Sequence, residues 1–181
     1  MQEIIRTDLI LSQSSFSHTL NIPIDNVDIA SWVFTVPEAE YQRCCSPDHI
    51  TAASTTTDDG RRMSINVEKI GTSLMIQHYI GEVAEKHYCK MVSTSDLFTP
   101  NGRTRIQVIW ELRMKAIDAQ HCEYTNSVTS HPTQEFLDFI QKQGLTFEEA
   151  ARARQPISSD HNRRETPLFA ESIARAARAN R

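Results

Sequence analysis

The sequence has little of what several common protein classes require. Its four cysteines include no C-x-x-C pair, and Cys44 and Cys45 are adjacent, so the set is neither a disulfide framework nor a zinc knuckle. No apolar run approaches the roughly 18 residues that a membrane-spanning helix needs. No G-x-S-x-G motif occurs, so a serine hydrolase with that nucleophile turn is not indicated.

The excess of one sign of charge is also small. The 181 residues carry a formal net charge of -4 and have a sequence pI of about 6.0, which recruits neither nucleic acid nor an anionic membrane. The opening MQEIIRTDLI is too short and too charged for the apolar part of a targeting signal. We therefore expect a cytoplasmic protein with reduced cysteines.

What is present is a clear order of secondary structure. Residues 15–22 predict a first strand, Asp25 is placed to cap a short helix, and a second short helix begins at Pro37 and ends before Pro47. The middle of the chain then predicts an antiparallel meander of five or six strands, at residues 49–57, 61–70, 73–84, 86–95, 103–117 and 121–130.

The final third of the sequence is typical of helices. Residues 131–144 form an amphipathic pattern, and Thr146 with Glu149 makes a capping box for the next helix. Pro167 fits the first turn of a last helix, because an apolar stripe at helical spacing follows it. The preceding stretch DHNRRE, residues 160–165, is then either a helical turn or an irregular turn before that helix.

This order predicts the α+β class in a single domain, residues 1–181: a curved antiparallel sheet, two short helices after the first strand, and a long C-terminal helix across the sheet. The space between helix and sheet is a natural ligand cavity. The segment LNIPIDNVDIASWVF, the meander and the amphipathic end helix resemble the helix-grip superfamily of START, plant pathogenesis-related and polyketide cyclase domains. That superfamily hosts carriers, receptors, cyclases and hydrolases, so the fold alone does not decide function.

One branch of the superfamily adds a metal. The chain resembles diacetylphloroglucinol hydrolase and phloretin hydrolase, in which two His and two carboxylates bind zinc and a His-x-x-x-Glu pair comes from the C-terminal region. By the order along the chain, the resemblance implies the ligands His78, Glu111, His161 and Glu165. Such a set suits zinc, and also iron or manganese.

Two of these residues are supported by spacing and one by its surroundings. His161 and Glu165 are four residues apart, so on a helical turn both side chains point the same way. His78 shares strand parity with Leu74 and Ile76, so we expect it to face the cavity, where an imidazole needs a metal or a hydrogen bond. A hydrogen-bonded core histidine is the alternative for His78, and a solvated helix start is the alternative for residues 160–165.

Glu111 and Glu68 compete for the remaining position. Around Glu111 the apolar side chains alternate onto the other face, so simple parity places Glu111 in solvent unless a bulge intervenes. Glu68 lies on the strand before His78, and a hairpin turn would bring both to one side. The resemblance favours Glu111, with Glu68 as the substitute.

Tyr124 and Asn126 are candidate substrate-binding residues on the last strand. They share a face with Cys122 and Val128, and either polar group could hold a substrate hydroxyl or carbonyl. The alternative is a strand of mixed polarity without a ligand.

Two functions follow. The resemblance implies a metal-dependent hydrolase that cleaves a carbon–carbon bond of a small aromatic ketone or polyketide-like molecule through metal-activated water. The alternative is a metal-free cavity protein, either polyketide cyclase-like or a binder of hydrophobic ligand or lipid. Both imply a small hydrophobic or aromatic partner, no nucleic acid and no membrane, and both allow a homodimer. A third hypothesis is an interaction module with a filled cavity, which the polar His78, Asn126 and His161 disfavour.

Overall fold

A computed structural model describes residues 4–179 and shows a seven-stranded antiparallel sheet with helices packed against it. The strands are β1 (Ser12–Leu20), β2 (His49–Thr56), β3 (Arg62–Ile70), β4 (Ser73–Glu85), β5 (Tyr88–Thr99), β6 (Gly102–Ala116) and β7 (Cys122–Pro132). The helices are η1 (Ile24–Asn26), α1 (Ile29–Thr35), α2 (Glu38–Cys44), α3 (Gln134–Gln141) and α4 (Phe147–Ala179).

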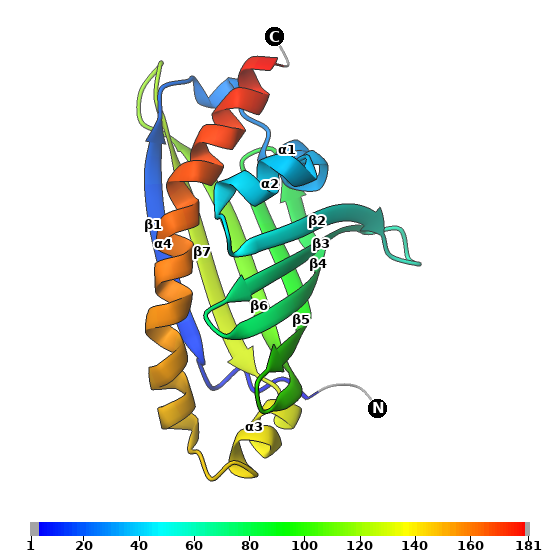
Figure 1. Ribbon diagram of the computed structural model, residues 1–181. Helices are drawn as coiled ribbons and strands as arrows, with labels where there is room; N and C mark the ends of the chain where they lie inside the picture. Colours follow the sequence, from blue (N-terminus) through cyan, green and yellow to red (C-terminus); the bar gives the residue numbers. More distant parts are fainter. Residues whose placement is uncertain (1–3, 180–181) are drawn as a thin grey trace.

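The sheet order is β1-β7-β6-β5-β4-β3-β2, so the first strand closes the meander by pairing with the last one. The sheet is curved, and α4 runs along it beside β1 and β7, while α1 and α2 lie at the end near β2 (Figure 1). The α+β helix-grip arrangement predicted from the sequence is confirmed, including both short helices after the first strand. This arrangement leaves an interior between α4 and the curved sheet.

A side-chain cap marks the start of α1, and a proline precedes α2. The Asp28 carboxylate accepts a hydrogen bond of 2.8 Å from the backbone N–H of Ser31 and so caps α1. The predicted cap at Asp25 is wrong, because Asp25 lies inside the 3-10 turn η1, which has no side-chain cap. Pro37 immediately precedes α2, close to the predicted start.

The longest helix continues through two prolines. α4 contains Pro156 and Pro167, so the prediction that the last helix begins near Pro167 is wrong. Each proline removes one hydrogen bond to the carbonyl four residues earlier. Those carbonyls belong to Arg152 and Arg163, which are exposed residues, so water can satisfy them.

The packing of α4 explains why the helix does not break. Phe169, Ala170 and Ile173 are buried at helical spacing against the sheet and the short helices. Thr166 also donates a hydrogen bond of 2.6 Å to the carbonyl of Asn162 beside the second proline. The stretch 160–165 is therefore helical.

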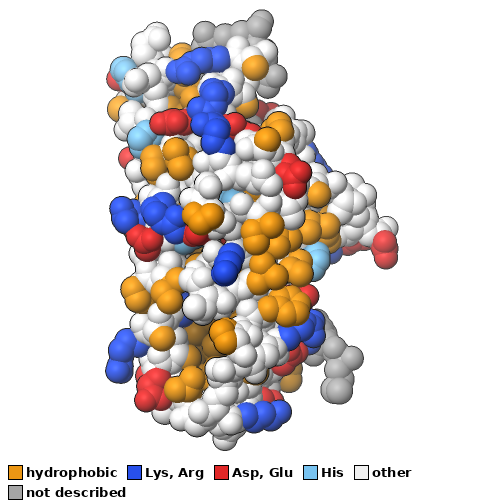
Figure 2. Space-filling view, viewed as in Figure 1, with side chains coloured by type: hydrophobic (Ala, Val, Ile, Leu, Met, Phe, Trp, Pro, Cys, Tyr) orange, Lys and Arg blue, Asp and Glu red, His pale blue; other side chains and the backbone are white. Residues whose placement is uncertain are grey.

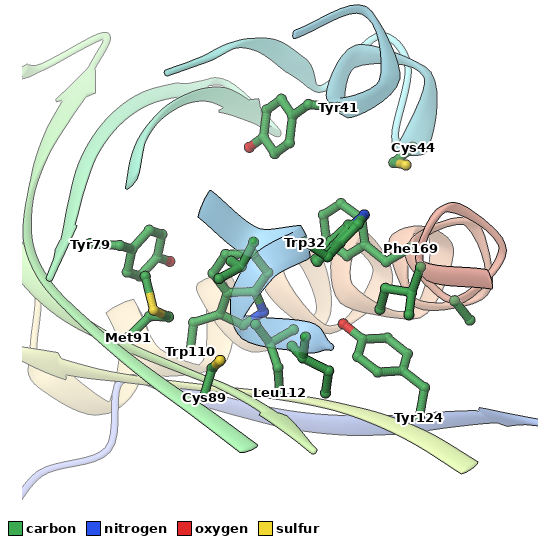
Figure 3. Packing of buried hydrophobic residues seen from close by; sticks show 14 of the residues in the cluster. Trp32, Tyr41, Cys44, Tyr79, Cys89, Met91, Trp110, Leu112, Tyr124 and Phe169 are labelled. Atoms are coloured by element: carbon green, nitrogen blue, oxygen red, sulfur yellow. The ribbon is translucent and has the colours of Figure 1, made fainter. Parts of the chain in front are cut away.

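An aromatic group fills the interior at one end of α4. The ring centroid of Phe169 lies 5.2 Å from that of Trp32 and 5.8 Å from that of Trp110 (Figure 3). The indole N–H of Trp32 on α1 donates a 3.0 Å hydrogen bond to Ser172, which lies about one turn after Phe169 on α4. These contacts join α1, α4 and the sheet into one core.

The surface carries mixed charge. Acidic and basic side chains are interspersed on the face shown in Figure 2, so this face has no broad region of one sign. Within residues 4–179, none of the helices combines the length and the apolarity needed to cross a membrane.

The dependence of α4 on its buried face can be tested with two identical substitutions. Ile173→Ala should lower the free energy of unfolding by about 2–5 kcal/mol, because Ile173 is 1% exposed and truncation leaves a cavity. Ile157→Ala on the same helix should cost less than about 1 kcal/mol, because Ile157 is 46% exposed. Urea denaturation measures both, and equal losses would contradict the packing described here.

Candidate metal centre

A small pocket with a cavity volume of about 40 Å³ lies between α4 and the sheet. An aromatic ligand would need side chains in the pocket wall to move. Trp110 and Phe169 contribute aromatic walls, and Tyr79 points into the same interior (Figure 3). The polar part of the lining includes Glu68, Gln77, Arg154, His161 and Glu165.

Two imidazoles and two carboxylates converge at the wall of this pocket. Oε2 of Glu165 lies 3.1 Å from Nε2 of His49 and 3.3 Å from Nε2 of His161. The Glu68 carboxylate lies 3.9 Å from Nε2 of His49 and 3.8 Å from Nε2 of His161. His49 comes from the start of β2, Glu68 from β3, and the other two from α4. Each of the four residues is buried.

Each histidine is oriented by a hydrogen bond at its other nitrogen. Nδ1 of His49 donates to the backbone carbonyl of Tyr41 at 2.8 Å. Nδ1 of His161 donates to the Asp48 carboxylate at 2.9 Å, and Arg164 pairs with the same carboxylate. Both Nε2 atoms are thereby turned toward the carboxylates, as second partners orient metal-bound histidines.

The carboxylates are held in the same way. Tyr41 donates its hydroxyl to Glu68, and the Gln77 amide, in the orientation that satisfies its neighbours, donates to both Glu68 oxygens at 3.2 Å. Asn126 donates to Glu165 at 3.0 Å and accepts from the Trp110 indole N–H at 2.7 Å. The four side chains are therefore fixed before any ligand arrives.

The electrostatics of the cluster are strongly coupled. Burial lowers the pKa of His161, but the nearby Glu165, Cys45 and Glu68 outweigh it, so the net direction is a raised pKa. Burial raises the pKa of Glu165, but His161 and His49 outweigh it and lower the pKa. Opposite charges therefore stabilise each other at this place in the structure.

The residues fit a divalent metal ion. Tetrahedral zinc with bonds of about 2.0–2.1 Å places neighbouring ligand atoms about 3.3 Å apart, and the four His–Glu pairs among the six pairs of such a set are 3.1 to 3.9 Å apart, with Glu68 using a different oxygen toward each histidine. Atoms of Cys45, His49 and His161 also lie within 4.8 Å of one another. The Cys45 sulfur, however, lies 3.7 Å from Nδ1 of His161, the nitrogen already bonded to Asp48, so the two-His, two-Glu set is the better ligand set.

The structure brings together half of the ligand set implied by the resemblance. His161 and Glu165 meet in the cluster, but His78 and Glu111 do not join them. On β4 the residues that line the pocket are Met75, Gln77 and Tyr79, so His78 alternates onto the opposite face. The parity argument failed because apolar side chains occupy both faces of this strand.

Glu111 also lies away from the cluster, on the face that simple alternation gives it. Its carboxylate accepts a 2.5 Å hydrogen bond from the hydroxyl of Tyr88. Glu68, named as the substitute, is the carboxylate that faces His161. The predicted substrate residue Asn126 positions Glu165 instead of lining the pocket, and Tyr124 is fully buried with a hydroxyl that has no hydrogen-bond partner among the described residues.

His49 is the member that sequence reasoning missed. It is the first residue of β2, and it pairs across the β2–β3 hairpin with Glu68 beside a register shift. The sequence predicts strands at residues 49–57 and 61–70, and extending their hairpin to its far end places His49 near Glu68. No local feature of the stretch marks His49 as a ligand.

Similarity to known proteins is visible in three dimensions only. No protein-family profile and no curated protein matches the sequence. The ZhuI aromatase/cyclase from a Streptomyces species superposes with a TM-score of 0.58 at 11% identity, covering 93% of this chain and 94% of that one. A START superfamily protein from Mycobacterium smegmatis gives 0.51 at 9% identity, covering 93% and 99%.

A third structure is the di-domain aromatase/cyclase StfQ from the steffimycin biosynthetic pathway. It gives a TM-score of 0.56 at 10% identity, and the match covers 94% of this chain but 53% of that one. At such identities these matches show the fold, which is the helix-grip, START-like fold. They do not address the hydrolase branch, so that resemblance stays a prediction.

Metal analysis separates the ligand set in the structure from the one implied by sequence order. Protein purified without chelator should hold a stoichiometric divalent ion, and His49→Ala or His161→Ala should remove it, because each imidazole supplies one ligand atom. His78→Ala is the matched control and should keep the metal. Elemental analysis of the wild type and the three variants provides the measurement. Loss of metal only in the His78 variant would refute the site.

Proposed function

We propose that the chain is a metal-dependent hydrolase acting on a small aromatic ketone or a related polyketide-like molecule. The observation that carries the proposal is the convergence of His49, Glu68, His161 and Glu165, each held by a second partner, at the wall of an aromatic pocket. The set keeps the His, Glu, His, Glu order of the hydrolases that the sequence resembles. Zinc fits these donors, and iron or manganese accepts them as well.

When bound, the ion would supply a Lewis acid and lower the pKa of a coordinated water. The chain's own residues hold the ligand. Trp110 and Phe169 offer aromatic surfaces to a ring. Tyr79 keeps its proton, because burial and the nearby Glu68 and Glu165 raise its pKa well above the ordinary value, so its hydroxyl can donate to a ligand oxygen.

The overall reaction is a hydrolysis. Water adds to the ketone carbon, the bond between that carbon and the ring breaks, and the ring carbon takes a proton. The products are a carboxylic acid and the deacylated ring, so atoms balance without an oxidant or reductant.

A metal-free cyclase-like or ligand-binding protein is the second candidate. The observation that favours it is the similarity of the fold to two aromatase/cyclases, together with the aromatic walls of the pocket. In that case His161 and Glu165 would be a buried ion pair that closes the pocket. The two candidates make opposite predictions for the effect of removing an imidazole.

The hydrolase proposal predicts release of acetate from an acetylated polyphenol. Dialysis against a strong chelator should abolish the release, and added zinc should restore it. Glu68→Gln should reduce the rate by at least about 100-fold, since losing a metal ligand should cost at least as much as losing a group that hydrogen-bonds a ligand. Glu111→Gln, a matched change on the outer face, should leave the rate unchanged. Activity that survives complete metal removal would contradict the proposal.

Ligand binding without turnover tests the second candidate. For a metal-free pocket, His161→Ala should bind an aromatic ketone about as well as the wild type, followed by quenching of the fluorescence of Trp110 in the pocket wall. If a metal contacts the ketone oxygen, the His161→Ala variant should bind the ketone at least about tenfold more weakly. A factor of ten corresponds to one lost hydrogen bond to a charged group.

A further inference from the structure

One arginine that lines the pocket forms no ion pair within the described part of the chain. Arg154 on α4 lines the pocket, but its Nε is fully enclosed and has no hydrogen-bond partner in the described part of the chain. Among residues 4–179, the hydrogen-bond partner of its Nη2 is the thioether sulfur of Met75, at 3.3 Å. A thioether is a weak acceptor, so it compensates little of the cost of enclosing the Nε end of this half-buried side chain.

The two poorly satisfied nitrogens form one edge of the guanidinium. Nε and Nη2 together bind a carboxylate in a bidentate manner. Elsewhere in this chain Arg6 uses the same edge, donating from Nε to one oxygen of Asp8 at 2.9 Å and from Nη2 to the other at 2.7 Å. In Arg154 the Nη2 end of this edge faces the buried side chain of Met75, which a ligand carboxylate would have to displace.

The charge on Arg154 persists at neutral pH. Burial lowers the pKa of the guanidinium to about 10, which still leaves it protonated. No carboxylate of residues 4–179 forms an ion pair with it, whereas most other pairs of arginine with acidic groups lie on the surface. A positive group without its counter-charge, in the wall of a pocket, is a recognition element for an anion.

The position of Arg154 limits the size of the ligand. Met75, its contact, is the cross-strand partner of Glu68, so the guanidinium lies near the two-His, two-Glu cluster. Arg154 and His161 are seven residues apart on the same helix, a rise of about 10 Å. The hydroxyl of Ser158 lines the pocket between them. A ligand about 10 Å long could therefore contact both the cluster and the guanidinium once side chains in the pocket wall move.

We propose that Arg154 binds a carboxylate of the ligand, so that the ligand class is an aromatic ketone that also carries a carboxylate on its ring system. The proposal rests on the proposed function for the ketone, but the carboxylate contact is independent of the metal. It makes Arg154 a specificity-determining residue of the pocket.

The test uses chelator-treated protein, so that a carboxylate cannot bind through a metal. The probes are 2-naphthoate and its neutral counterpart 2-naphthamide, with dissociation constants measured from tryptophan fluorescence. Arg154→Met should weaken naphthoate binding by at least about tenfold, the value of one hydrogen bond to a charged group, and naphthamide binding by less than about twofold. Arg154→Lys should lie between, because lysine keeps the charge but loses the bidentate edge.

Arg152→Met is the matched control, because Arg152 is exposed on the same helix. It should bind both probes like the wild type. The melting temperature of Arg154→Met should not fall, because the change removes an uncompensated charge from an enclosed place.

Three results would overturn the proposal. These are wild-type protein that binds naphthoate no better than naphthamide, an Arg154→Met variant that retains naphthoate affinity, and a variant that loses both probes equally with a lower melting temperature. Metal content, measured in parallel, separates this proposal from the hydrolase function. A chain that binds no metal but discriminates naphthoate through Arg154 keeps this inference and refutes the other.

Discussion

The rest of the structure depends on the burial of one charge, the carboxylate of Glu165, which is 4% exposed in the middle of α4. An unpaired carboxylate in such a place would cost several kcal/mol. Its partners are His161 on the same helix, His49 at the start of edge strand β2, and Asn126 on β7 near the opposite edge. The partners of this carboxylate therefore connect the long helix to strands on both sides of the curved sheet, and Glu165 itself lines the pocket.

The fold could be predicted from the sequence because its signals are local and repeated. Turns at Asp59-Gly60 and Gly102 divide the meander, and the apolar stripe around Phe169 identifies the buried face of the last helix. The expectation that a proline marks the start of a helix failed at Pro167. Packing of buried residues on both sides of Pro167 outweighs one lost backbone hydrogen bond. That error mattered for function, since a continuous helix is what aligns His161 with Glu165.

The candidate site could be predicted only in the half that lies on one helix. Spacing alone aligns His161 with Glu165, whereas His49 and Glu68 meet them through the register of a hairpin and the curvature of the sheet. Strand parity misassigned His78 because the outer face of β4 is apolar as well, so alternation could not tell the inside from the outside. Side chains from different elements converge through tertiary structure, and a single sequence gives little information about which distant residues meet.

The number of protons on the cluster decides how its two carboxylates are neutralised. Nδ1 of each histidine must carry a hydrogen, because one faces the carbonyl of Tyr41 and the other faces the Asp48 carboxylate. In neutral imidazoles both Nε2 atoms are then lone pairs, and they face the lone pairs of Glu68 and Glu165. Four acceptors cannot satisfy one another. Protons on the rings or on the carboxyl groups, or a divalent cation at the centre, must lie between them. Protonated rings agree with the raised pKa of His49 and His161, and a cation agrees with Nδ1 contacts that leave both Nε2 lone pairs facing the carboxylates.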